Sequence, residues 1–192
     1  MLYFPVIEHA EDLDLTPLLT TCEYSGPVTS YMPIATARFA FARDLGAVFV
    51  LCSFDTHPFV SGDESMEEDS IVCAAFNFFP ESGSKVARII ANSEGRCFLQ
   101  VDGGERRRID TVLLHGEDER GIYWGVRAEI TRDMLAEIYG EDEIKPGKTL
   151  LGNVFKQKAA GAGKHLGAIA PFGGDGGIFD DRNLREFTAE LM

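Results

Sequence analysis

Residues 67–80, with the sequence EEDSIVCAAFNFFP, decide the fold of this chain. The segment starts with acidic, turn-forming residues and continues with nine mainly apolar residues from Ile71 to Phe79. It ends at Pro80, which cannot continue a central strand ladder. Both alternating faces are mainly apolar, so we predict a buried strand in the middle of a sheet, covered on both sides.

Further strand patterns precede and follow this segment. Residues 36–42 and 47–54 flank the turn Asp44-Leu45-Gly46, which predicts a β-hairpin. Met1–Ile7 contains Pro5 and indicates an edge strand, because proline donates no ladder hydrogen bond. The other predicted strands are 85–92, 96–101, 111–114, 121–130, 150–157 and 186–191.

One helix follows the strand at 121–130. Thr131 is a suitable N-cap, the apolar positions after it repeat with a helical period, and Gly140 ends the pattern, so we predict a short helix near 131–139. One helix among many short strands indicates an all-β fold. We expect an antiparallel two-sheet β-sandwich of the jelly-roll type that forms a single domain over residues 1–192.

Composition and charge limit the possible partners. The hydrophobic content of 45% is that of an ordinary globular protein, and the net charge is −13. This charge repels phosphates and anionic lipids, so we expect no nucleic-acid partner and no membrane partner. The sequence does not indicate the oligomeric state.

The cysteines and the N-terminus bear on the cellular location. Cys22, Cys52, Cys73 and Cys97 are widely spaced and three of them lie in predicted strands, which favours reduced, buried thiols. The N-terminal residues have no basic segment of the kind that begins a signal peptide. We expect a cytoplasmic protein, or a secreted one if a leader has been removed.

The order of these segments resembles the carbohydrate-binding family 9-like domains. The matching residues are Asp69-Ser70 at the start of the central strand, Asn92 and Gly95, the strand and helix from Trp124 to Leu135, and Asn153 to Lys156. The resemblance implies a β-sandwich that binds sugars through aromatic platforms and polar side chains, often beside a structural calcium ion.

We predict a sugar site from this resemblance and from the strand patterns. Aromatic rings stack on the apolar face of a sugar while planar polar groups bind its hydroxyls. If strands 123–129 and 151–157 pair, their outer faces form such a patch with Phe155 exposed. His165 and Phe172 lie where the family places ligand contacts. The candidate residues are Arg88, Asn92, Tyr123, Arg127, Asn153, Phe155, His165 and Phe172.

Simpler interpretations remain open for these residues. The patch can be an ordinary solvated sheet face, and Arg88 with Asn92 can form polar contacts between strands. Trp124 alternates with apolar residues and is expected in the core.

The acidic loop before the central strand offers hard oxygen ligands. Asp63, Glu67 and Asp69 are candidate ligands for calcium, although they lack EF-hand spacing, and a solvated acidic loop is the alternative. No other cofactor is expected.

Two further function classes stay open beside non-catalytic sugar binding. One is a hydrolase or lyase that uses dispersed acidic residues, since the chain contains many carboxylates but no recognisable catalytic motif. The other is a scaffold whose sugar site has decayed, because the closing segment 159–177 contains no tryptophan that could serve as a platform.

Overall fold

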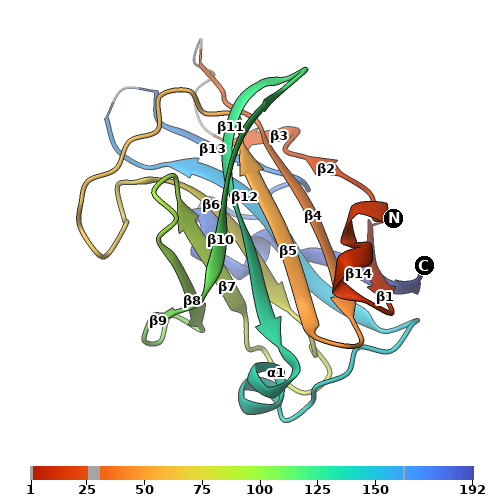
Figure 1. Cartoon of the computed structure of the whole chain (residues 1–192). Helices are drawn as coiled ribbons and strands as arrows, with labels where there is room; N and C mark the ends of the chain where they lie inside the picture. Colours follow the sequence, from red (N-terminus) through yellow and green to blue (C-terminus); the bar gives the residue numbers. More distant parts are fainter. Residues whose placement is uncertain (1, 26–30, 162) are drawn as a thin grey trace.

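The computed structural model describes residues 2–25, 31–161 and 163–192 and shows a curled β-structure with one α-helix (Figure 1). Its strands are β1 (Leu2–Ile7), β2 (Leu19–Thr20), β3 (Glu23–Ser25), β4 (Ala35–Ala42), β5 (Gly46–Ser53), β6 (Ser70–Asn77), β7 (Ala87–Asn92), β8 (Cys97–Val101), β9 (Arg107–Arg108), β10 (Thr111–Asp118), β11 (Gly121–Thr131), β12 (Thr149–Lys158), β13 (His165–Ala168) and β14 (Arg185–Leu191). The helices are α1 (Arg132–Tyr139) and three short 3₁₀ segments, η1 (Ala10–Leu15), η2 (Gly177–Phe179) and η3 (Asp181–Asn183).

The strands form one hydrogen-bonded path that curls on itself. Its order is β10-β11-β5-β4-β1-β14-β12-β6-β7-β8-β9, with β13 beside β12 and β2 beside β4. The largest apolar cluster among the described residues contains residues from both halves of this path, so the curl brings two layers of strands face to face. The prediction of an all-β fold is therefore confirmed, although the two layers belong to one continuous sheet.

The N-terminal strand β1 differs from the prediction in two ways. It lies between β4 and β14 instead of at an edge, and it runs parallel to both, so the sheet is mixed and not purely antiparallel. Its contact with β4 involves only Val6 and Ile7, while Leu2 to Val6 pair with β14. Pro5 thus lies where β1 has a partner on one side only, which is where a residue without an N–H group is tolerated.

Strand β6 is buried along its whole length between β12 and β7, as predicted. Its inner face carries Phe76, whose ring contacts Phe4 and Phe39 at centroid distances of 5.2 Å each. Gly152 lies directly opposite Phe76 on β12, and a Cβ atom there would lie 2.2 Å from the Phe76 ring. The core therefore requires glycine at this position.

The predicted hairpin and helix are both confirmed. Strands β4 and β5 pair antiparallel across the turn before Gly46. Helix α1 begins after Thr131, whose hydroxyl accepts a hydrogen bond from the Met134 amide, and ends at Gly140 with a left-handed φ of 76°. No described helix has the length and apolar character that crossing a membrane requires.

Candidate functional site

Phe155 lies in the protein interior, so the prediction of an exposed aromatic platform is wrong. Its relative exposure is 1%, and its ring centroid lies 6.3 Å from that of Phe172. The condition for the predicted patch, pairing of strands 123–129 and 151–157, is not met, because β11 pairs with β10 and β5 while β12 pairs with β6, β13 and β14. Residues 169–184, which we call the closing part of the chain, fold back over this face of β12 and exclude water from it.

Two predicted sugar ligands hold that closing part in place. The buried Asn153 amide donates to the carbonyls of Ala170 and Asn183 at 3.2 and 2.7 Å. The buried Arg88 guanidinium donates to the Ile178 carbonyl at 3.0 Å and forms an ion pair with Asp181. Both side chains therefore have protein partners.

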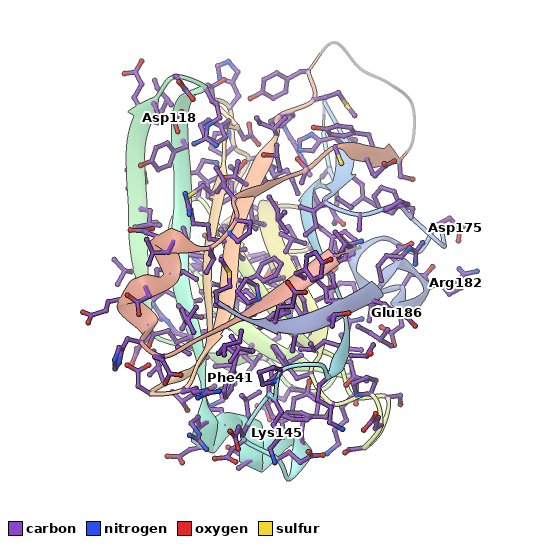
Figure 2. All side chains as sticks on the ribbon, turned by 90° about the vertical axis from the view of Figure 1, so that its right-hand side faces the viewer. Phe41, Asp118, Lys145, Asp175, Arg182 and Glu186 are labelled. Carbon is purple, nitrogen blue, oxygen red and sulfur yellow. The ribbon has the colours of Figure 1, made fainter. Side chains whose placement is uncertain are left out.

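Charged side chains lie on the outer surface of this closing part. Asp175 and Arg182 project from it into solvent, beside Glu186 at the start of β14 (Figure 2).

Asn92 is the last residue of β7, and the predicted calcium ligands lie in the loop that leads into β6. The Asn92 amide donates to Asp69 Oδ2 at 2.9 Å, while Asp69 Oδ1 accepts from both the amide and the hydroxyl of Ser61. In the part of the chain that the structure describes, no group of three or more acidic, histidine or cysteine side chains is placed to hold a metal. Asp63, Glu67 and Asp69 are thus not brought together, and a calcium requirement stays a prediction.

Tyr123 and Arg127 lie on the outer face of the opposite layer. The Tyr123 ring contacts Phe54 at a centroid distance of 5.6 Å beside a shallow groove of about 160 Å³. Arg127 donates to the Ala10 carbonyl at 3.3 Å and pairs with Glu129 at 3.5 Å. The eight predicted sugar ligands are therefore distributed over both layers, and their role in binding stays a prediction.

A hollow of about 370 Å³ lies between the loop that leads into β6 and the strands β8 and β9. These segments lie on the same side of the molecule (Figure 1). We call this site the arginine hollow, and its lining residues are Gly62, Glu64, Arg96, Phe98 and Arg108. Phe98 is half-buried and lies directly opposite Arg108 across the β8–β9 ladder. Arg96 donates to the carbonyls of Gly62 and Asp63 at 3.3 Å each, which ties the loop to β8.

A buried polar cluster lies between the two layers, at the end of the structure opposite α1. There β5 and β12 end and β11 begins (Figure 1). We call Ser53, Asp55, Trp124, Lys156 and His165 the mouth cluster. Asp55 Oδ2 lies 3.1 Å from Lys156 Nζ, and both side chains are 0% exposed. This ion pair joins the two layers, since Asp55 follows β5 and Lys156 belongs to β12.

Four buried polar atoms of the mouth cluster have no hydrogen-bond partner within the described ranges. Asp55 Oδ2 has only its ion pair with Lys156, while Ser53 Oγ, Trp124 Nε1 and His165 Nε2 have neither a hydrogen bond nor an ion pair. Ser53 and Trp124 are cross-strand partners, and Lys156 Nζ lies 5.8 Å from the centre of the Trp124 ring. Trp124 is 4% exposed, which confirms the prediction that it is buried. Each unpaired buried polar atom costs about 1–3 kcal/mol, so these atoms favour a polar partner such as ordered water or a ligand.

The pKa values of the mouth cluster reflect burial and mutual charge. Burial lowers the pKa of Lys156 to about 8, against the opposing effect of Asp55. Burial opposes the charge of Asp55, but Lys156 and the Tyr31 hydroxyl outweigh it and lower the pKa of that carboxyl. Burial and then the Lys156 charge lower the pKa of His165 to about 4. At neutral pH the cluster therefore contains a neutral imidazole beside an ion pair.

The His165 pKa predicts acid sensitivity of the fold. The unfolded state takes up a proton near the ordinary histidine pKa of about 6.5, whereas the folded state does so only near pH 4. Between these values the unfolded state binds more protons, so stability falls as the pH falls. We expect this residue to account for a loss of about 2–3 kcal/mol between about pH 7 and about pH 4, measured by urea unfolding.

Two histidine variants make this measurement specific. His165→Asn should reduce the fall in the free energy of unfolding between about pH 7 and about pH 4. His9→Gln should make this fall steeper. The exposed His9 has a pKa raised by its hydrogen bond to Asp44 and so stabilises the fold at low pH. An unchanged pH dependence in His165→Asn would show that His165 is protonated equally easily in both states.

Sequence reasoning missed Lys156, Asp55 and the arginine hollow. A signal for Lys156 was present, because it shares a face of its strand with Val154, which is buried. The run of arginines from Arg106 to Arg108 was likewise visible, but only the β8–β9 pairing places Arg108 beside Phe98.

Comparisons with solved structures identify the fold. A presumed carbohydrate-binding protein from Bacteroides uniformis superimposes with a TM-score of 0.67 at 14% identity, covering 99% of this chain and 98% of that chain. A family 9 carbohydrate-binding module from Caldicellulosiruptor kristjanssonii in complex with cellotriose superimposes with a TM-score of 0.65 at 9% identity, covering 99% and 94%. Comparison of the sequence with protein-family models and with curated proteins finds no match.

These similarities confirm, at the level of the fold, the resemblance found in the sequence. The chain has the β-fold of family 9-like carbohydrate-binding modules over nearly its whole length.

Proposed function

We propose that this protein is a non-catalytic carbohydrate-binding domain and that the arginine hollow holds the sugar. The observation that carries the proposal is the half-buried Phe98 ring, which lies next to Arg108 across the ladder in a hollow of about 370 Å³. This volume is within the range of about 300–1,000 Å³ that is usual for small-ligand sites.

The chemistry of the lining suits a sugar. The flat ring of Phe98 can stack on the apolar C–H face of a pyranose, while the guanidinium groups of Arg96 and Arg108 donate to its hydroxyls. Glu64 supplies an acceptor on the loop side of the hollow. The shared fold with a module in complex with cellotriose supports the same class of ligand.

The number of carboxylates at this site favours sugar binding without hydrolysis. Glu64 is the single carboxylate among the described residues that line the hollow. Glycoside hydrolases use two carboxylates on either side of the bond that they cleave. The hollow therefore supports recognition of a sugar better than its cleavage.

Phe98→Leu is expected to weaken binding of the best oligosaccharide at least about tenfold, which corresponds to about 1.4 kcal/mol. Leucine keeps apolar bulk at this position but removes the flat ring. Isothermal titration calorimetry measures the change, after a thermal-shift screen of mono- and oligosaccharides with and without calcium has selected the ligand. Arg108→Gln should also weaken binding, because it removes the charge of the guanidinium.

Tyr3→Ala is the matched control, since Tyr3 is an aromatic residue on β1 with 43% exposure and lies outside the hollow. It should leave the affinity unchanged. Full affinity in both Phe98→Leu and Arg108→Gln would place the sugar elsewhere. The absence of any sugar-dependent shift across the screen would reject sugar binding itself.

A further inference from the structure

The mouth cluster shares no residue with the arginine hollow and presents a different kind of surface. Its polar atoms are buried between the two layers, and the Trp124 ring forms an aromatic wall beside Lys156 Nζ. We propose that the mouth cluster is a second, enclosed binding site for one small polyhydroxy molecule, and that Tyr31 covers it.

The three unpaired atoms define the chemistry of this ligand. Trp124 Nε1 can only donate a hydrogen bond, and the Ser53 hydroxyl can both donate and accept. His165 Nδ1 lies 2.8 Å from the Gly163 carbonyl, which only accepts, so Nδ1 carries the hydrogen. In the neutral ring Nε2 is therefore an acceptor.

A set that combines a donor, an acceptor and a hydroxyl is complementary to hydroxyl groups, which also donate and accept. It does not suit a carboxylate or a fully ionised phosphate ester, because those groups cannot donate to His165 Nε2 or to Asp55 Oδ2. A neutral ligand with neighbouring hydroxyls, such as glycerol or the edge of a single sugar ring, satisfies all of these atoms.

Tyr31 is positioned as the cover. Its hydroxyl donates to Asp55 Oδ1 at 2.8 Å and accepts from the Thr56 amide at 2.8 Å. Its ring is half-buried and lies close to His57 and Gly163. Tyr31 therefore contacts residues that follow β5 and a residue that precedes β13. A ligand enters the mouth cluster when the Tyr31 side chain moves.

The single tryptophan of the chain provides a direct readout. In ¹⁵N-labelled protein the Trp124 indole N–H gives one resonance, and we expect glycerol, glucose or xylose to shift it in a saturable manner. Ser53→Ala removes one hydrogen-bonding group at little cost in volume and should weaken this saturation about fivefold to tenfold. Tyr31→Phe removes the hydrogen bonds that the Tyr31 hydroxyl forms with Asp55 and Thr56 and should raise the rate of association.

Phe98→Leu separates this site from the arginine hollow. It should leave the saturation at Trp124 unchanged even where it abolishes oligosaccharide binding, so failure of the proposed function and failure of the second site are distinguishable. Three results would overturn the second site. The first is the lack of a saturable shift with all three probes, and the second is a shift that is lost in Phe98→Leu but kept in Ser53→Ala. The third is magnetisation exchange of the indole N–H with water alone, which would assign the cluster to ordered water.

Discussion

Lys156→Met is expected to lower the free energy of unfolding by about 3–5 kcal/mol. The substitution keeps an unbranched side chain of similar length but leaves the Asp55 carboxylate without its cation. Asp55 and Lys156 are both 0% exposed, and their charged atoms lie 3.1 Å apart. Urea or thermal unfolding monitored by circular dichroism measures the loss.

A double-mutant cycle identifies the cause of this loss. Asp55→Asn combined with Lys156→Met removes both charges and should recover a large part of the stability, because no uncompensated charge is then buried. A loss below about 1 kcal/mol in Lys156→Met alone would indicate that water reaches Asp55.

Phe155→Ala is expected to lower the free energy of unfolding by about 3–5 kcal/mol, the usual range for truncating a buried phenylalanine. Phe155 belongs to a second apolar cluster on the outer face of β6 and β12, together with Ile71, Ala168 and Ile178. The strand pattern placed Phe155 at the surface in a sugar-binding patch, which would imply the opposite result, a small loss of stability and a loss of sugar binding.

Phe179→Ala is the matched control for Phe155→Ala. Phe179 lies in the same closing part of the chain but is 49% exposed, so its truncation should change stability by less than about 1 kcal/mol. Similar small effects for both variants would mean that the closing part does not cover β12 in solution.

The secondary structure was largely predictable because it depends on local patterns. The apolar run of β6 allowed a buried central strand and no other element, and the start and end of α1 followed from Thr131 and Gly140. The alternation around Trp124 placed that side chain inward in the same way. These features require only the period of a strand, the chemistry of helix caps and the conformational freedom of glycine.

The candidate sites were less predictable because they depend on which strands meet. Strand periodicity indicates that Phe155 and Lys156 point to opposite faces, but not that the closing part covers the face of Phe155. Nor does it indicate that Lys156 meets Asp55, which precedes it by about a hundred residues and lies in the other layer.

The sequence alone therefore determined the all-β class, the central strand, the hairpin, the helix and the resemblance to family 9-like domains. Only the tertiary structure decided that the N-terminal strand lies inside the sheet, that the outer face of β12 is covered, and that the arginine hollow and the mouth cluster exist. The physical reason is that local propensity acts over a few neighbouring residues. Strand order and the covering of a face depend on contacts between segments far apart in the chain, which no single segment encodes.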